Sequence, residues 1–365
     1  MCKSTEGARN TKEKMLMKLG RRATNKAICG AVMAAIISVS IELVGCGLSQ
    51  EKIYTSSIFA MDTIMELQIA GREDYTPQAE ETIRNIEKSL SVTDPESQIA
   101  KLNSNGETDV DTQVSDIMTR ALDVCKRTDG QLDVTIYPVL KAWGFTTGDY
   151  RVPTEDELHG LLGNVDYKQV QARADHLSIP DGFQVDLGSV AKGYTGSYVA
   201  DGLRELGVTS ALLNLGGNVQ CIGVKPNGDK WKVAVKSPFP DSATGMLGVV
   251  SADDVAIITS GGYERYFEED GEIYWHILDP RTGKPARSGL ASVTIIGKDG
   301  LLCDGLSTAL FIKGLDEAVE FWKASDDFEA VLVTEDGEVY VTEGVAKDFT
   351  LTAEYSNAPL HVVSR

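Results

Sequence analysis

Residues 276–285 read HILDPRTGKP; an apolar run, LASVTIIG at 290–297, and the segment DGLST at 304–308 follow them. The stretch combines a Pro/Gly turn, a predicted strand and a predicted helix. On that helix Asp304 and Thr308 share one face, because side chains four residues apart are neighbours. Both supply the hard oxygen donors that suit Mg²⁺. The stretch therefore predicts a site for phosphate chemistry.

The rest of the chain predicts strands and helices in separate runs. Thr76-Pro77 is a favoured start for a helix, and apolar residues keep helical spacing from Val114 to Cys125. Thr154 opens a capping box. Further helices are expected at about 189–206, 301–312 and 316–324, and strands at about 53–70, 169–179, 183–187, 211–215, 231–235, 255–259, 274–278, 290–296, 330–334 and 338–342. Because strands mostly follow strands, we predict an α+β fold with a largely antiparallel sheet and clustered helices.

The charge of the chain is acidic and unevenly distributed. The formal net charge is −19, but eight of the 35 basic residues and only three of the 54 acidic residues precede Cys46. The remainder therefore carries −24 and repels nucleic-acid phosphates, which argues against a DNA or RNA partner. An acidic protein that handles a phosphate ligand must gather cations locally, most simply a metal ion and a few placed lysines.

The N-terminus predicts a targeting segment that does not belong to the fold. A basic stretch ends at Lys26, an apolar run covers 27–44, and LVGC at 43–46 resembles a bacterial lipobox with Cys46 as the lipidated residue. A plain transmembrane anchor is the alternative. The small residues before the cysteine and the polar run after it favour a lipoprotein at the bacterial cell membrane, on its extracytoplasmic face.

The cysteines beyond Cys46 are few and widely spaced. Cys125, Cys221 and Cys303 form neither a disulfide framework nor a zinc-site pattern. We expect them to be buried, small apolar residues.

A glycine-rich junction, VDLGSVAKG at 185–193, passes from a predicted strand into a predicted helix. A helix start offers free backbone N–H groups and a positive dipole end to an anionic ligand. Lys192 adds a cation, and Asp186 lies at the strand end. The segment matches neither a Walker A loop nor a GxGxxG fingerprint. Taken alone, the segment is better interpreted as an ordinary helix start with a glycine for clearance.

Three other segments are ambiguous singly. LNLGGN at 213–218 and TSGGY at 259–263 are either tight turns or places where a ligand approaches the backbone. GQLDVTIYP at 130–138 places Asp133 where a strand is expected to begin, or where its carboxylate caps a turn. His276, on a predicted strand, is either a core residue or a base that titrates in the useful range.

Taken in order, the segments resemble the FAD:protein FMN transferase (ApbE) family over about 60–320. The motifs that carry the resemblance are MDT at 61–63, DPES at 94–97, DVT at 133–135, VDLGSVAKGY at 185–194, NLGGN at 214–218, TSG at 259–261, HILDPRTG at 276–283 and DGLST at 304–308. The resemblance implies a signal peptide at 1–45, a tether at 46–58, an ApbE-like domain at 59–350 and a C-terminal tail at 351–365.

The resemblance also implies a reaction and roles for residues. Members bind FAD with Mg²⁺ and move its FMN half onto a Thr or Ser hydroxyl of a target protein through a phosphodiester bond, releasing AMP. The expected partners are flavoprotein subunits of redox pumps or extracytoplasmic electron-transfer proteins. His276 is the candidate that activates the acceptor hydroxyl. The expected FAD contacts are Met61, Gln131, Leu132, Asp133, Asp186, Lys192 and Leu278, and the expected metal set is Ser189, Asp304 and Thr308.

One position departs from the pattern that the resemblance implies. Thr93 stands where many relatives are expected to carry an aromatic residue over the isoalloxazine. A Thr loses that stacking, worth about 1 kcal/mol for a good aromatic pair. Hydrolysis of FAD to FMN and AMP is therefore an alternative activity, and a non-catalytic flavin-binding lipoprotein is a third.

Overall fold

The computed structural model describes residues 51–365, which form one unit of helices and mostly antiparallel strands. The largest sheet has the strand order β1-β2-β6-β7-β10-β15-β16-β17-β19. Its strands are β1 Lys52–Ala60, β2 Thr63–Gly71, β6 Ala211–Leu215, β7 Asn218–Ile222, β10 Ala256–Gly261, β15 Leu290–Gly297, β16 Phe328–Thr334, β17 Val339–Thr342 and β19 Leu360–Val363. Each neighbouring pair is antiparallel except β17 and β19. The predicted α+β class with a largely antiparallel sheet is confirmed.

Smaller sheets and the helices surround the main sheet. The smaller sheets pair β8 Trp231–Lys236 and β18 Phe349–Leu351 with β9 Met246–Ala252, β3 Glu107–Asp109 and β4 Gln171–Arg173 with β5 His176–Ser178, β11 Tyr266–Glu269 with β12 Glu272–Trp275, and β13 Leu278–Asp279 with β14 Lys284–Pro285. The helices are α2 Thr76–Leu90, α3 Gln98–Asn105, α4 Thr112–Arg127, α5 Tyr137–Ala142, α6 Glu155–Leu162, α7 Gly188–Glu205, α8 Gly300–Lys313, α9 Leu315–Lys323 and α10 Glu343–Ala346, with single 3₁₀ turns η1 Tyr167–Gln169 and η2 Ala353–Tyr355. Within residues 51–365, none of these helices is long and apolar enough to span a bilayer.

The central strands of the main sheet are buried on both faces, and neighbouring residues on these strands pack into different cores. Ile258 and Ile295 pack with side chains of α8, whereas Ile257 and Ile296 pack with the sheet of β8 and β9. This follows from the alternation of side chains along a strand. It also explains the continuous apolar run at 290–297, since a strand covered on both faces needs no polar side.

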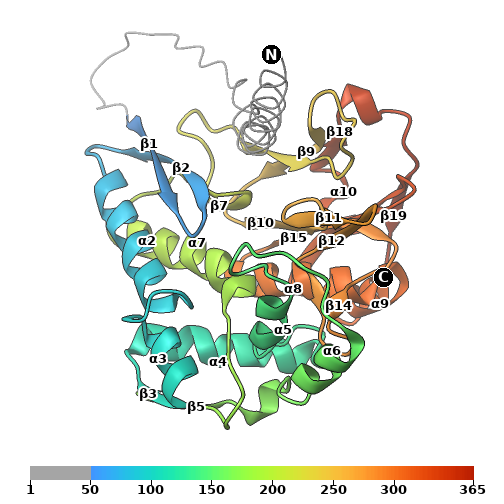
Figure 1. Ribbon diagram of the computed structural model, residues 1–365. Coiled ribbons are helices and arrows are strands. Elements are labelled where there is room, and N and C mark those ends of the chain that lie inside the picture. The colour runs from blue at the N-terminus through green and yellow to red at the C-terminus, as the bar shows by residue number, and fades with distance from the viewer. Residues whose placement is uncertain (1–50) are drawn as a thin grey trace, which may run out of the picture. The chain divides into compact units, whose positions relative to one another are not determined.

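Helices α7 and α8 lie side by side against the main sheet, and α4 packs on their far side (Figure 1). The two helices approach closely because glycines face each other. A Cβ on Gly193 would come within 2.7 Å of the carbonyl carbon of Gly300 and of the Cβ of Asp304. Any larger residue at Gly193 would push apart the two helices that carry the predicted metal ligands.

Five expected elements differ in the structure. The strands expected at 53–70 and 169–179 are each divided by a turn, into β1 and β2 and into β4 and β5. The other three differ for local reasons. Residues 183–187 form no strand, because the Asn103 side chain donates to the Val185 carbonyl at 2.8 Å and accepts from its N–H at 2.7 Å, replacing a partner strand. The strand expected at Asp133 is a turn before α5, with the carboxylate as its cap. The strand expected over 274–278 is interrupted at His276, between β12 and β13.

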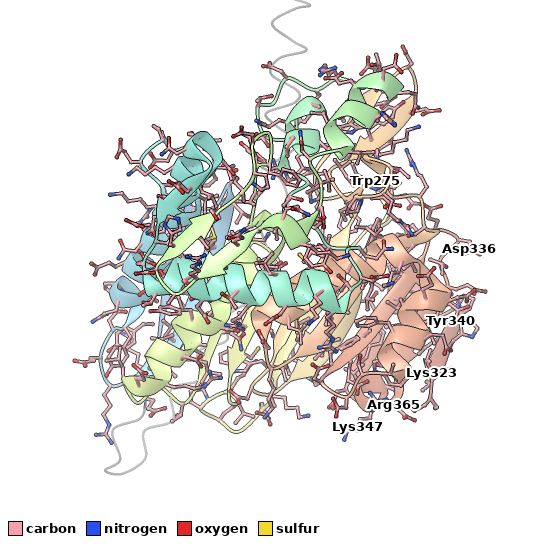
Figure 2. All side chains as sticks on the ribbon, turned by 90° about the horizontal axis from the view of Figure 1, so that it is seen from below. Trp275, Lys323, Asp336, Tyr340, Lys347 and Arg365 are labelled. Atoms are coloured by element: carbon pink, nitrogen blue, oxygen red, sulfur yellow. The ribbon has the colours of Figure 1, made fainter. Side chains whose placement is uncertain are left out.

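The expected tether and tail also differ from the structure. Residues 52–58 belong to β1, which pairs with β2 along its whole length, so the expected tether over 46–58 ends before Lys52. Residues 360–363 form β19, parallel to β17, so the expected tail over 351–365 contributes to the main sheet. His361 stacks on Tyr340 at 4.6 Å, and the Arg365 guanidinium lies over Trp322 at the same distance. Figure 2 shows Tyr340, Lys323 and Arg365 together on this side of the unit. The predicted signal peptide and Cys46 lie outside the described residues.

Candidate functional site

The predicted metal ligand Asp304 lies on α8 and is 4 % exposed. Its Oδ2 atom accepts a hydrogen bond from the backbone N–H of Gly193 at 2.8 Å. Burial raises the pKa of Asp304, while the charge of Lys192, the Gly193 N–H and the Asn218 side chain oppose that effect. The carboxylate is thus held against the second turn of α7, where a bound cation would offset the cost of its burial.

Thr308 lies one turn further along α8 and meets a second predicted motif. Its hydroxyl is 3.2 Å from the Oγ atom of Ser260 on β10, and Ser260 is 2.7 Å from the hydroxyl of Ser307. Ser307 in turn donates to the Asp304 carbonyl at 2.7 Å. The segments TSG at 259–261 and DGLST at 304–308 therefore meet in one hydrogen-bonded group.

Ser189 lies in the first turn of α7. In a regular helix the N–H of Gly193 would point to the carbonyl of Ser189, four residues earlier. Here that N–H donates to Asp304, and because a carbonyl oxygen has two lone pairs, the Ser189 carbonyl can accept a further partner. A carboxylate, a hydroxyl and a carbonyl oxygen form a donor set that fits Mg²⁺. No group of three or more His, Cys, Asp or Glu residues with metal-binding geometry occurs between residues 51 and 365.

Asp186 joins the start of α7 to the segment that carries Gln131 and Asp133. Its carboxylate accepts from the N–H of Gly188 at 2.8 Å, and its own N–H donates to the Val134 carbonyl at 2.8 Å. Burial raises the pKa of Asp186, against the Gly188 hydrogen bond and the positive charges of Arg265 and Lys192. Asp186 therefore stands close to two cations.

The segment 131–133 is buried and contains an unpaired polar atom. Asp133 is engaged within the protein, since it accepts from Thr135 N at 2.8 Å, Thr135 Oγ1 at 2.5 Å and Tyr167 N at 2.9 Å. Burial raises the pKa of Asp133 despite these bonds. Leu132 packs in the core beside α4. Gln131 is 7 % exposed, and its Oε1 atom has no hydrogen-bond partner in the described part of the chain. Such an atom fits an N–H donor of a ligand.

Met61 occupies the turn between β1 and β2 in a strained conformation. Met61 and Asp62 have φ values of 49° and 59°, a region that few residues other than glycine adopt. The Met61 N–H donates to the Glu87 carboxylate at 2.6 Å, and the Met61 sulfur is 3.9 Å from the hydroxyl of Thr195 on α7. The surroundings therefore hold this strained turn beside α7, as is common at functional sites.

His276 is half-buried between β12 and β13. The carbonyl of Arg265 accepts from its backbone N–H at 3.1 Å and lies 3.2 Å from its Nδ1 atom. Removal of water and the positive charges of Arg265 and Lys192 lower the pKa of His276 to about 4, against that backbone hydrogen bond. The imidazole is therefore neutral at pH 7.

Leu278 and the turn that follows it are anchored to α5. Leu278 is 5 % exposed and packs against Val139, Trp143 and Phe145. The Trp143 indole N–H donates to the carbonyl of Gly283 at 2.7 Å. This anchoring fixes the segment HILDPRTG, so the position of His276 depends on packing some 140 residues away in sequence.

The structure thus brings several of the predicted residues to α7: Asp304 contacts Gly193, Asp186 contacts Gly188, and the Met61 sulfur meets Thr195. Thr308 contacts Ser260 on β10, and Leu278 packs with residues of α5 and the loop after it. Sequence reasoning did not identify Arg265, whose charge acts on both Asp186 and His276. Its position four residues beyond TSG is the one available signal, and it is weak. Thr93 is exposed, and its side chain is 3.2 Å from the hydroxyl of Ser91. The three cysteines expected to be apolar core residues are buried and free.

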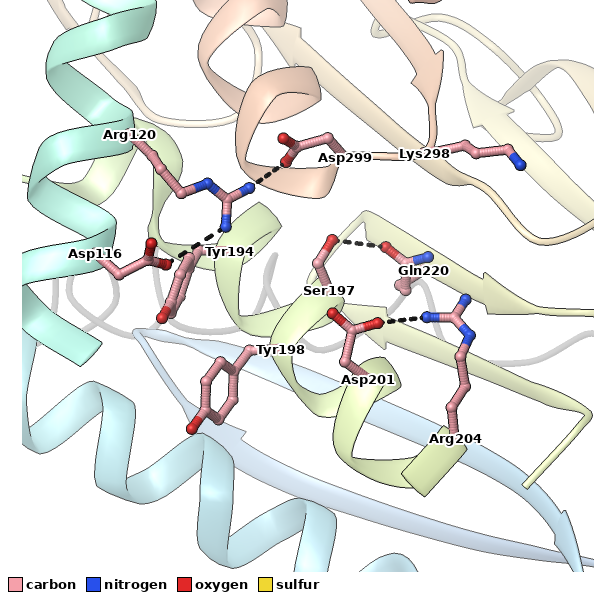
Figure 3. Close-up of a pocket in the computed structure, with 10 residues that line it drawn as sticks. All are labelled: Asp116, Arg120, Tyr194, Ser197, Tyr198, Asp201, Arg204, Gln220, Lys298 and Asp299. Carbon is pink, nitrogen blue, oxygen red and sulfur yellow. Dashed lines mark hydrogen bonds and ion pairs between the residues drawn. The ribbon is translucent and has the colours of Figure 1, made fainter. Parts of the chain in front are cut away.

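A pocket of about 380 Å³ opens on the other side of α7 (Figure 3). Tyr194 and Tyr198 line this pocket. At ~100° a residue they lie roughly 200–240° around α7 from Lys192, and so on a different face of the helix. The arginines of the pocket are already paired, Arg120 with Asp299 at 2.6 Å and Arg204 with Asp201 at 2.7 Å. None of the predicted site residues lines this pocket.

Comparison with known proteins finds matches over most of the chain. The model of the ApbE family matches residues 61–332. An FAD:protein FMN transferase from Klebsiella pneumoniae is 30% identical, over 81% of this chain and 93% of the relative. The crystal structure of the ApbE protein from Thermotoga maritima superposes with a TM-score of 0.76 at 31% identity, covering 81% of this chain and 99% of the other. The flavin transferase ApbE from Vibrio cholerae superposes with a TM-score of 0.73 at 25% identity, covering 82% and 99%.

Proposed function

The chain belongs to the ApbE family and is a flavin transferase, and we propose that it moves the FMN half of FAD onto a Thr or Ser hydroxyl of an acceptor protein. The product is a phosphodiester, and AMP leaves. The observation that carries this proposal is the close crossing of α7 and α8, which places the Asp304 carboxylate 2.8 Å from the Gly193 N–H, one helical turn beyond Ser189, and near the charge of Lys192. The positive dipole end of a helix, a buried carboxylate and a lysine together suit a pyrophosphate with its cation.

Ser189, Asp304 and Thr308 would hold Mg²⁺ through a carbonyl, a carboxylate and a hydroxyl oxygen. When bound, the ion supplies positive charge that offsets the charge developing on the pyrophosphate. The buried carboxylate of Asp304 supports this assignment, since its raised pKa reflects a charge without a full counterion.

The residues before α8 bind and orient the substrate. Lys192 and the positive dipole end of α7 neutralise phosphate oxygens, which an acidic body does not otherwise attract. The unpaired Oε1 of Gln131 accepts an N–H of FAD, and Met61 covers part of the ligand from the β1–β2 turn. Positioning of this kind accounts for most of the catalysis of phosphoryl transfer by proteins.

His276 accepts the proton of the acceptor hydroxyl. The hydroxyl oxygen forms a bond to the phosphorus of the FMN half, the bond from that phosphorus to the bridging oxygen breaks, and AMP leaves with the electron pair. Because His276 is neutral at pH 7 and its Nδ1 lies against a carbonyl, Nε2 is the atom that takes the proton.

Hydrolysis of FAD is the second candidate, and the exposed Thr93 favours it. A small polar side chain that is turned to Ser91 offers no stacking surface for an isoalloxazine ring. A loosely covered flavin admits water to the phosphorus more readily than a covered one. Water would then replace the acceptor hydroxyl, and FMN would be released free.

We further propose that the protein is anchored by lipid at Cys46 on the extracytoplasmic face of a bacterial membrane. Its acceptors are then flavoprotein subunits of redox pumps or electron-transfer proteins exposed on that face. The apolar run at 27–44 followed by LVGC supports this location. A Cys46→Ala variant is expected to leave the membrane fraction; retention of that variant in the membrane would contradict lipid anchoring.

The function is tested by incubating the protein with FAD, Mg²⁺ and a candidate acceptor. Covalent flavin fluorescence on the acceptor, stable to acid, supports transfer; free FMN alone supports hydrolysis; unchanged FAD contradicts both. His276→Ala is expected to slow transfer by roughly 10²–10⁴-fold, the usual contribution of a general base. Transfer by His276→Ala at the wild-type rate would remove His276 from this role.

A further inference from the structure

Arg265 lies at the end of the β11–β12 hairpin and holds His276 through its backbone. The hairpin pairs Tyr266 with Trp275, and the His276 N–H extends this ladder by one bond to the Arg265 carbonyl at 3.1 Å. The same carbonyl lies 3.2 Å from His276 Nδ1. A carbonyl only accepts, so Nδ1 must carry the hydrogen.

The side chain of Arg265 fixes this hairpin end to a different part of the fold. Its Nη2 atom donates to the Phe145 carbonyl at 2.7 Å, in the loop that follows α5. Phe145 is 4 % exposed, and its ring meets the His276 ring edge-on with centroids 6.3 Å apart. Arg265, Phe145 and His276 therefore form a closed triangle in which each residue contacts the other two.

The charge of the Arg265 guanidinium also acts on the site. Arg265 and Lys192 are the two cations whose charges reach both His276 and Asp186. Both cations disfavour a proton on the imidazole. A protonated imidazole could not take the proton of the acceptor hydroxyl.

We propose that Arg265 is a positioning residue that holds His276 with its Nδ1–H on the Arg265 carbonyl and its Nε2 atom free to accept the acceptor's proton. The proposal rests on the proposed function for the role of Nε2, whereas the orientation and tautomer of the ring do not depend on it. Arg265 acts through His276 and has no contact with the reacting atoms.

The test compares Arg265→Gln and Arg265→Lys with the wild-type protein. Gln keeps an N–H donor toward the Phe145 carbonyl but loses the charge, and Lys keeps the charge but loses the forked geometry. Arg287→Gln is the matched control, because Arg287 also donates to a carbonyl of this hairpin, that of Ile273, and its guanidinium lies 4.0 Å over Trp275 rather than on His276.

The first readout is the ¹⁵N imidazole spectrum, which is tractable because the chain has four histidines. The wild-type and Arg287→Gln proteins are expected to show His276 as the Nδ1–H tautomer at pH 7, assigned by the signal lost in His276→Gln. Arg265→Gln is expected to show a mixture of tautomers. An Nε2–H tautomer in the wild type, or an unchanged spectrum in Arg265→Gln, would overturn the proposal.

The second readout is the pH dependence of single-turnover transfer. Arg265→Gln is expected to move the acidic side of this pH profile upward by about half a pH unit, as removal of one nearby solvated charge does. Arg265→Lys is expected to restore the wild-type profile. An unmoved profile in Arg265→Gln would contradict the role of the charge. If no acceptor is modified by any variant, the proposed function fails, and the tautomer spectrum still decides the orientation of His276.

Discussion

The crossing of α7 and α8 predicts that Gly193→Ala is far more harmful than a glycine substitution elsewhere in the same helix. The added Cβ would lie 2.7 Å from the Asp304 Cβ and closer still to the Gly300 carbonyl oxygen. An ordinary contact needs about 3.5 Å, so the helices must separate by at least ~0.8 Å. Backbone cannot move aside as a flexible side chain would.

Two terms set the size of the effect. Overpacking of a tight helix crossing costs about 1–3 kcal/mol. Separation of the helices also weakens the hydrogen bond from the Gly193 N–H to the Asp304 carboxylate, and its complete loss costs about 1.5–3 kcal/mol. The two are coupled, so we expect a loss of roughly 3 kcal/mol in the free energy of unfolding, or roughly 5 °C in Tm.

Gly202→Ala is the internal control, because a Cβ at Gly202 in the same helix would meet no atom within 4 Å. It is expected to stabilise by about 0.4–1 kcal/mol through the unfolded state. The assay is urea and thermal unfolding of both variants, followed by the rise in Tm on addition of Mg²⁺, which Gly193→Ala should reduce. Unfolding free energies of the two variants within about 0.5 kcal/mol of each other would refute the reasoning.

Three further predictions concern single groups of the site. Lys192→Met is expected to lower kcat/KM by about 10²–10³-fold, as loss of a phosphate-facing charge does, while Lys232→Met on the exposed face of β8 leaves it unchanged. Glu87→Ala removes the acceptor of the Met61 N–H and is expected to cost about 1–3 kcal/mol and to raise the KM for FAD more than it lowers kcat; Glu87→Gln keeps an acceptor and should do neither. The pKa of His276 is about 4 in the folded protein, below its ordinary value of 6.5, so its contribution to stability is complete above pH 6.5 and is lost as the pH falls toward 4. Between pH 7 and 4, the free energy of unfolding of His276→Asn is therefore expected to fall by about 1–2 kcal/mol less than that of the wild type, after discounting for solvent at the half-buried ring. Equilibrium urea titrations at both pH values would show this difference.

Elements with a complete local pattern could be predicted from the sequence. Helical spacing from Val114 to Cys125 lies within α4, the capping box at Thr154 opens α6, and the apolar run at 290–296 lies within β15. Each signal is contained in one segment, so no tertiary contact is needed to interpret it. The order of the motifs also identified the family, because eight short segments in sequence are more specific than any one of them.

The expectations that failed depend on contacts between distant segments. At Val185 the side chain of Asn103 takes the place of a partner strand. No pattern of residues in 183–187 predicts this contact. Leu360–Val363 pairs with β17 in a parallel register. The sequence of this short, exposed strand does not predict its partner. The close approach of Gly193 and Gly300 likewise requires knowledge of how two helices cross. Spacing along the chain cannot supply it.

The site concentrates unfavourable electrostatics that a bound cation would relieve. Burial raises the pKa of Asp133, Asp186 and Asp304, so each ionised carboxylate at neutral pH weakens the metal-free fold, and this penalty grows as the pH rises through each raised pKa. Asp133 and Asp186 lie on segments that precede α7, and Asp304 on α8 contacts Gly193 where the two helices cross. A cation bound by Asp304 removes the penalty there and stabilises the folded state by mass action. Tight helix packing and cation affinity are therefore linked at Gly193: a variant that loosens the crossing should lose both, and one that removes the Asp304 charge should gain metal-free stability while losing the response to Mg²⁺.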